Sequence, residues 1–153
     1  VLLGKALSGG MMPVSAVLAD DEIMLTIQPG EHGSTYGGNP LACRTAIVAL
    51  QTIQDENMNE NAIAMGAILR KELSRINSPH IREVRGKGLL NAIVIDHVKK
   101  DAAWELCLQL KEHGLLAKPT HGDKIRFAPP LIITEQQLGE CVRIITNSLS
   151  CLD

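Results

Sequence analysis

One lysine near the start of the chain, Lys5, stands where its side-chain amine could attack a carbonyl and form a Schiff base. It follows the short apolar run Val1–Leu3 and precedes a Ser-Gly-Gly bend at residues 8–10. We expect the run to be a strand and the bend a tight turn, which would hold the amine partly desolvated and help it lose its proton. Taken alone, the same pattern also fits a solvated surface lysine.

The glycine-rich segment 28–38 suits the binding of a phosphate. It carries four glycines around the hydroxyl-bearing pair Ser34 and Thr35. Hydroxyls and free backbone N–H groups in such a turn are donors that cost little to pre-organise for an anion. A solvated surface loop is the alternative for this segment by itself.

Arg126 is a third candidate, as a ligand for a carboxylate, because a planar guanidinium binds two carboxylate oxygens at once. It lies between Ile125 and Phe127 on a short predicted strand that stops at a Pro-Pro pair. Side chains alternate along a strand, so these two neighbours should point to the opposite face and leave the guanidinium alone on its side. An outward-facing charge on an edge strand is the alternative.

The pattern of apolar residues around these candidates predicts alternating strands and helices. Strands are expected at 1–3, 14–18, 81–84, 89–95, 115–117 and 124–127, with a glycine-flanked turn at 85–88 whose alternative is a basic anion site. Helices are expected to start near Asp20, at the Asn39-Pro40 cap, after a cap at Asn59, near Ala103 with an end at Gly114, and after the capping box 134–137.

The composition limits the classes of function that the chain can have. The 153 residues include 45% hydrophobic and 21% charged residues, which are globular values, and the net charge of −2 gives no general case for nucleic acid or an anionic membrane. Aromatic content of 2% leaves no stacking platform for bases. The four cysteines form no CxxC pair, so small buried thiols are expected rather than a disulfide framework or a metal site.

Taken in order, these segments resemble the class III (fold type I) aminotransferases that use pyridoxal 5'-phosphate (PLP), and within them the ornithine δ-aminotransferase branch. The resemblance runs over essentially the whole chain. The matching segments are Leu3–Gly10 (LGKALSGG), Pro29–Leu41 (PGEHGSTYGGNPL), Val84–Ala92 (VRGKGLLNA), Gly114–His121 (GLLAKPTH) and Ile125–Leu131 (IRFAPPL).

The resemblance implies a role for each candidate. Lys5 would hold PLP as a Schiff base and later move the substrate proton, which makes it both catalytic and cofactor-binding. Thr35, with Ser34 beside it, would bind the PLP phosphate of the neighbouring subunit, so a homodimer or higher homo-oligomer is implied. Arg126 would bind the α-carboxylate of 2-oxoglutarate and pair with a glutamate while ornithine is bound. No metal is implied.

The implied reaction is transfer of the δ-amino group of ornithine to 2-oxoglutarate, giving glutamate 5-semialdehyde and glutamate, in the mitochondrial matrix or alternatively the cytoplasm. The expected fold class is α/β: residues 1–40 as the tail of a fold type I large domain, 41–57 as a connecting helix, and 58–153 as an α+β small domain. The chain has no initiator Met and is expected to be a fragment, inactive alone, because the family's pyridinium-binding aspartate lies upstream of Lys5.

Two other functions stay open at this point. One is another class III aminotransferase, of the acetylornithine or 4-aminobutyrate type, which shares the lysine and the threonine. The other is a catalytically silent fragment that keeps the small domain. Two histidines are also weighed: His32 and His121 each stand beside a candidate loop, and bracing the loop is preferred over contact with cofactor or substrate.

Overall fold

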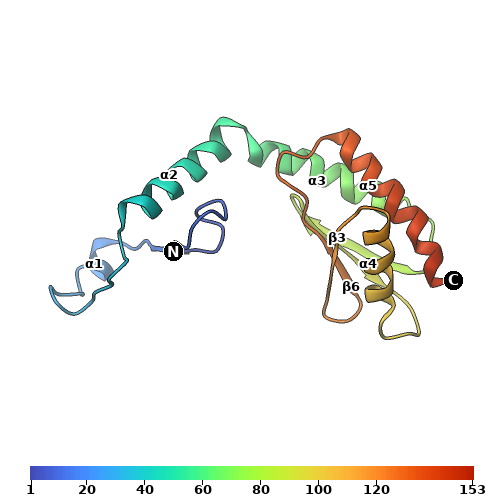
Figure 1. Ribbon diagram of the computed structural model, residues 1–153, viewed down its shortest axis with the longest axis horizontal. Coiled ribbons are helices and arrows are strands. Elements are labelled where there is room, and N and C mark those ends of the chain that lie inside the picture. The colour runs from blue at the N-terminus through green and yellow to red at the C-terminus, as the bar shows by residue number, and fades with distance from the viewer. The chain divides into compact units, whose positions relative to one another are not determined.

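A computed structural model describes all residues, Val1–Asp153, and the chain separates into two compact units. The first, the lysine unit, spans Val1–Asn57, and the second, the α+β unit, spans Met58–Asp153 (Figure 1). Each unit is described here by itself. The second unit begins at Met58, and the helix expected as a connection over 41–57 lies in the first unit; the assignment of these parts to domains stays a prediction.

The lysine unit is built on a short antiparallel pair and one long helix. Its elements are β1 (Leu2–Leu3), β2 (Ala16–Val17), α1 (Asp21–Met24) and α2 (Pro40–Asp55). The predicted cap of α2 is confirmed: the Asn39 side chain accepts a hydrogen bond from the Ala42 N–H at 2.9 Å, and Pro40 occupies the first turn.

The lysine unit has almost no core. Ser8 and Ala42 are its only buried residues, whereas Met11 and Tyr36 are each 82% exposed. A unit of this size needs far more buried apolar surface to offset the conformational entropy lost on folding. Its apolar side chains therefore need a covering surface that these 57 residues do not supply.

The α+β unit contains a four-stranded antiparallel sheet and three long helices (Figure 1). The sheet order is β3-β4-β6-β5. The elements are α3 (Met58–Ser74), β3 (Ile81–Lys87), β4 (Leu90–Ile95), α4 (Ala102–Glu112), β5 (Lys118–Thr120), β6 (Lys124–Phe127), α5 (Glu135–Ser148) and a final 3-10 turn, η1 (Leu149–Leu152).

The helices cover one face of this sheet. The core joins Ile93 and Ile125, both fully buried on neighbouring strands, to one leucine from each helix: Leu73, Leu106 and Leu138. The predicted capping box is confirmed, since the Thr134 hydroxyl and the Gln137 side chain each bond the other's backbone N–H. The predicted end of α4 at Gly114 is also confirmed, with a left-handed φ of +85°.

The predicted position of one edge strand was wrong. The edge strand is β5 at 118–120 rather than 115–117, because Leu115 still closes the end of α4 through a bond from its N–H to the Leu110 carbonyl. Pro119 lies in this edge strand, where a missing N–H is tolerated. The loop is shorter than expected and turns at His121 and Gly122, both with positive φ.

The predicted turn at 85–88 was displaced as well. Strand β3 continues through Lys87, and the hairpin turns at Gly88 and Leu89. Within this strand, position 86 requires glycine, because a Cβ added there would lie 2.3 Å from the Asn91 Oδ1. Helix α3 also starts at Met58, so Asn59 lies inside it rather than capping it.

Candidate functional site

Lys5 occupies a strained position at the end of β1. Its φ is +53°, in the left-handed region, which costs a residue with a side chain about 1–2 kcal/mol. The turn that follows is held by bonds from the Leu7 N–H to the Gly4 carbonyl and from the Gly9 N–H to the Ala6 carbonyl. Strain of this kind is frequent at functional sites, but Asn57 and His121 have a similar left-handed φ, so the angle supports Lys5 as a candidate only together with its residue type.

Ser8 fixes this turn, and the sequence analysis missed its role. Its hydroxyl is buried, accepts a hydrogen bond from the Met12 N–H at 3.1 Å and donates to the Met12 carbonyl. The signal available in the sequence was a small hydroxyl residue before a Gly-Gly pair, which is a common way to brace a bend. Ser8 therefore holds the loop that carries the lysine.

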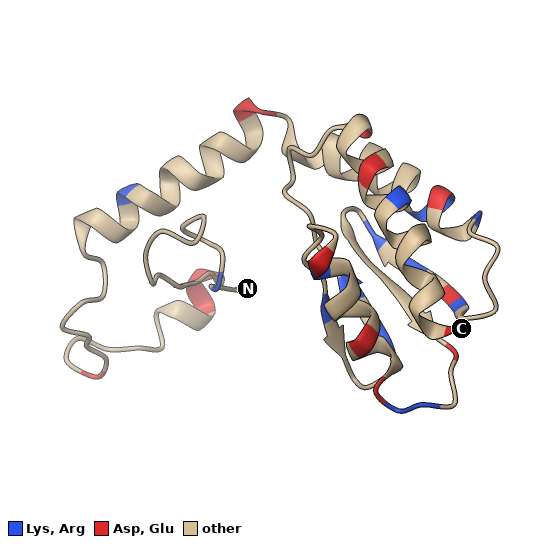
Figure 2. Cartoon of the chain, turned by 45° about the vertical axis from the view of Figure 1, so that its right-hand side comes forward, with Lys and Arg blue, Asp and Glu red and all other residues tan.

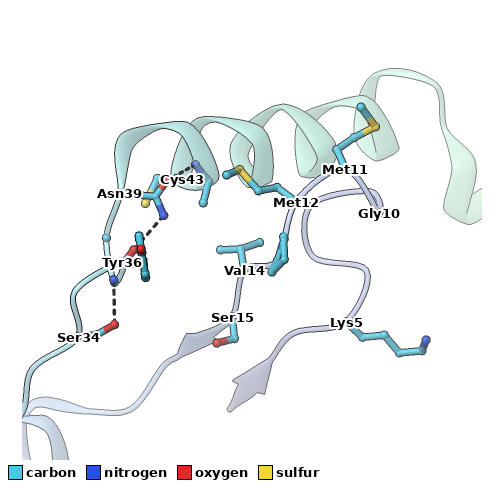
Figure 3. Close-up of a pocket in the computed structure, with 14 residues that line it drawn as sticks. Lys5, Gly10, Met11, Met12, Val14, Ser15, Ser34, Tyr36, Asn39 and Cys43 are labelled. Atoms are coloured by element: carbon cyan, nitrogen blue, oxygen red, sulfur yellow. Dashed lines mark hydrogen bonds between the residues drawn. The ribbon is translucent and has the colours of Figure 1, made fainter.

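The expectation that Lys5 is partly desolvated was wrong for this unit. Its side chain is exposed and makes no hydrogen bond or ion pair. Figure 3 shows it extending away from Ser34 and Tyr36. The physical reason is the missing core of the lysine unit, which leaves no apolar wall over the amine.

Lys5 nevertheless borders an open pocket of about 840 Å³ formed by the lysine unit (Figure 3). The wall comes from three segments: the lysine turn with Met12, the glycine-rich loop with Ser34 and Tyr36, and the first turns of α2 with Asn39 and Cys43. An amine and a hydroxyl from distant parts of the sequence thus line one cavity. This grouping of Lys5 with Ser34 is the main geometric feature of the unit.

Ser34 and Thr35 are placed differently. The Ser34 Oγ accepts a hydrogen bond from the Gly37 N–H at 2.9 Å, which leaves its own proton free to donate to an anion. Thr35 is exposed, does not line this pocket, and its hydroxyl has no hydrogen bond. Ser34, but not Thr35, therefore lines the same pocket as Lys5 within one chain.

The loop is braced by Glu31 rather than by His32. The Gln28 N–H donates to the Glu31 carboxylate at 2.7 Å, and the Asn39 side chain donates to the Tyr36 carbonyl at 2.9 Å. His32 is exposed and makes no hydrogen bond, so the bracing role expected for it was wrong. His121 has φ +50° in the turn between β5 and β6, in keeping with a structural role.

Arg126 lies in the α+β unit, on β6. Its neighbours Ile125 and Phe127 are buried at 0% and 6% exposure, while Arg126 itself is exposed. The predicted alternation is confirmed: the guanidinium stands on the face of the sheet that the helices leave uncovered. It forms no ion pair with any carboxylate of the chain.

The thiols lie mainly outside the pocket. Burial raises the pKa of the Cys107 thiol to about 11, and burial also raises the pKa of Cys141 and Cys151. A thiol with a raised pKa is a poor nucleophile at neutral pH; Cys107 is buried in the core, Cys141 is half-buried and Cys151 is exposed. No disulfide forms, as expected, no group of residues is arranged to hold a metal, and no helix is long and apolar enough to cross a membrane.

The Aminotransferase class-III family profile matches residues 1–149. The chain belongs to this family. It is 64% identical over 149 residues to the mitochondrial ornithine aminotransferase of Rattus norvegicus, covering 97% of this chain and 34% of that protein. It is 62% identical over 149 residues to the mitochondrial ornithine aminotransferase of Drosophila melanogaster, with the same coverage. The chain therefore spans about a third of the length of the curated relatives it matches.

Solved structures agree with this assignment. The acetylornithine aminotransferase of Elizabethkingia anophelis matches with a TM-score of 0.92 and 58% identity, over 97% of this chain and 40% of that one. An ornithine aminotransferase of Toxoplasma gondii, described with partial occupancy of PLP at its active site, matches with a TM-score of 0.90 and 43% identity, over 99% of this chain and 36% of that one. The mixed α/β class expected from the sequence is confirmed at this level.

Proposed function

We propose that the protein to which this chain belongs is a PLP-dependent aminotransferase that moves the δ-amino group of ornithine to 2-oxoglutarate. The observation that carries the proposal is that Lys5, at φ +53° on a turn braced by Ser8, borders a pocket of the lysine unit. The curated relatives, ornithine aminotransferases at up to 64% identity, support the choice of substrate. The name "mitochondrial" carried by several of them supports a place in the mitochondrial matrix, with the cytoplasm as the alternative.

The residues of the pocket fit PLP. An aldehyde needs an amine, which Lys5 would provide, and a phosphate needs hydroxyl and backbone N–H donors, which the glycine-rich loop with Ser34 would provide to the neighbouring subunit. When bound, PLP supplies an aldehyde and a conjugated ring that accepts the electron pair left on a substrate carbon. Thr35 is exposed and does not line the pocket of its own chain, which leaves its hydroxyl available for the phosphate in a neighbouring subunit of a homodimer.

The chain's own residues would then act as follows. The Lys5 amine would bind the cofactor covalently, give way to the substrate amine, and take the proton from the δ-carbon of ornithine. Arg126 would bind the α-carboxylate of 2-oxoglutarate through its two-pronged guanidinium in the second half of the reaction. Domain boundaries follow the same proposal: 1–40 in the large domain, 41–57 as connection, and 58–153 as the small domain.

The experiment that tests this proposal uses the full-length protein loaded with PLP. Borohydride reduction followed by peptide mass spectrometry should place the cofactor mass on Lys5, and the Lys5→Ala variant should lose ornithine-dependent turnover while keeping its circular dichroism. A cofactor mass on a different lysine, or turnover of Lys5→Ala within tenfold of the unmodified enzyme, would remove Lys5 from the mechanism.

A second substrate is favoured by one observation, the 58% identity to a protein named acetylornithine aminotransferase. Ornithine and N-acetylornithine differ in the charge of the α-amine, so single-turnover rates with each amine separate the two activities. A faster half-reaction with N-acetylornithine would replace the proposed substrate while leaving the roles of Lys5 and Ser34 unchanged.

A further inference from the structure

The uncovered face of the sheet in the α+β unit carries a row of cations centred on Arg126. The strand register places Arg126 directly opposite Lys118 on β5 and opposite Ala92 on β4, and Ala92 is opposite Arg85 on β3. Directly opposed residues of antiparallel strands point to the same face, with Cβ atoms about 4.5–5.5 Å apart. Arg85, Lys118 and Arg126 therefore form one line across the four strands, interrupted by the small side chain of Ala92.

The charged residues on this face are mainly basic. Alternation along the strands assigns to it five basic residues and a single acidic one, Glu83. Figure 2 marks lysine and arginine positions on the strands in blue. The basic residues are Arg85, Lys87, Lys118, Lys124 and Arg126. Two of them are partly neutralised: Arg85 lies 3.9 Å from the Glu83 carboxylate, and Lys124 pairs with Asp123.

Lys118 and Arg126 have no such partner. Both side chains are exposed, and neither forms an ion pair or a side-chain hydrogen bond. Like charges set directly opposite each other across a strand pair are unfavourable, and no acid of the chain relieves them. An ammonium and a guanidinium at this spacing can both contact one carboxylate. The attraction of each cation to the carboxylate then offsets the repulsion between the two cations.

We propose that Lys118 is a second carboxylate-binding residue, which acts beside Arg126 on the same carboxylate of the acceptor substrate. This inference rests on the proposed function, because it takes the role of Arg126 from it. Arg126 would fix the orientation of the carboxylate through two parallel hydrogen bonds, and Lys118 would add a point charge that raises affinity. Arg85 lies near the Glu83 carboxylate and is separated from Arg126 by Ala92. It would therefore contribute only to the positive electrostatic potential around the site.

The test compares Lys118→Met with Lys87→Met in the full-length holoenzyme. Lys87 is the matched control because it lies on the same face, opposite Leu90, and is also exposed and unpaired. We expect Lys118→Met to raise KM for 2-oxoglutarate roughly three- to tenfold, the range for losing one charge-assisted contact at an exposed site, with little change in kcat. Lys118→Arg should restore KM, and Lys87→Met should leave it unchanged.

Two further measurements keep the outcome decisive. The ornithine half-reaction of Lys118→Met should keep its rate, which shows that the variant is folded and loaded. The dissociation constant of glutarate, a non-reacting dicarboxylate, should rise with KM and lose part of its dependence on salt. An unchanged KM, an equal effect of Lys87→Met, or equal losses in both half-reactions would overturn the inference.

Failure of the proposed function would look different. In that case the unmodified enzyme would not turn over ornithine, or Arg126→Lys would leave the 2-oxoglutarate half-reaction intact. Failure of the inference alone would leave those two results as proposed and make Lys118→Met behave like Lys87→Met.

Discussion

Replacing Gly66 with alanine should destabilise the α+β unit more than any ordinary surface change. Gly66 is buried in the middle of α3, where the helix crosses the hairpin between β3 and β4. A Cβ built on it would lie 1.8 Å from the carbonyl oxygen of Gly88 and 2.3 Å from its carbonyl carbon. Both atoms are backbone, so the contact cannot be relieved by rotating a side chain.

The cost can be worked from the neighbours of that carbonyl. Moving the oxygen from 1.8 Å to an ordinary contact distance beyond 3.4 Å would displace the hairpin from the helix, and overpacking of this kind costs about 1–3 kcal/mol. The same oxygen accepts hydrogen bonds from Arg70 at 2.8 Å and Asn91 at 3.1 Å, each worth about 1 kcal/mol. Alanine returns about 1 kcal/mol of helix propensity, which leaves a net loss of about 2–4 kcal/mol.

Urea denaturation followed by circular dichroism measures this loss. Gly139→Ala on α5 is the matched control, because it is also a helix-interior glycine but has no atom within 4 Å of an added Cβ. It should raise the free energy of unfolding by about 0.5–1 kcal/mol. If Gly66→Ala proved as stable as Gly139→Ala, the close approach of α3 to the hairpin would be refuted.

Three other predictions concern the proposed site and the charges near it. Thr35→Ala in the full-length enzyme should weaken PLP retention roughly tenfold, because one hydroxyl donor to a doubly charged phosphate is lost; an unchanged dissociation constant for PLP would count against the phosphate role. Arg126→Lys should reduce kcat/KM of the 2-oxoglutarate half-reaction by about 1.5–3 kcal/mol and affect the ornithine half-reaction less; stopped-flow traces of each half-reaction decide it, and equal losses would refute the role. The side chains of Lys124 and then Arg82 hold the pKa of Asp123 below its ordinary 3.8, so its contribution to stability is present above that value and is lost as the pH falls through the lowered pKa. Asp123→Asn should therefore lower the urea midpoint at neutral pH, and this deficit should shrink as the pH falls below 3.8; a deficit that keeps the same size at all pH values would contradict this.

Local signals in the sequence predicted much of the fold because they act over a few residues. The caps at Asn39 and Thr134 and the glycine end at Gly114 are set by nearby backbone groups, and all three are confirmed. The strand β5 was misplaced because its position depends on pairing with β6. The paired residues are four to eight positions apart, across a turn whose φ values could not be read from the sequence. Pro119 added to the error, since proline usually argues against a strand.

In the candidate site, too, the features set by adjacent residues could be predicted and those set by distant residues could not. The orientation of Arg126 followed from simple alternation beside Ile125 and Phe127. The exposure of Lys5 did not, because desolvation depends on surfaces distant in sequence, and the lysine unit buries only Ser8 and Ala42. The bracing contact of Glu31 was equally hidden, since nothing local distinguishes a carboxylate that folds back onto the Gln28 N–H from one that faces water.

The edge strand β5 has a consequence for how the α+β unit behaves in a crowded solution. A sheet edge with free N–H and C=O groups recruits further strands, and proteins suppress this with prolines and charges. Here Pro119 removes a donor from one edge, and Arg82 and Arg85 add charge to β3 at the other. The sheet is closed to further growth, so the α+β unit should resist aggregation.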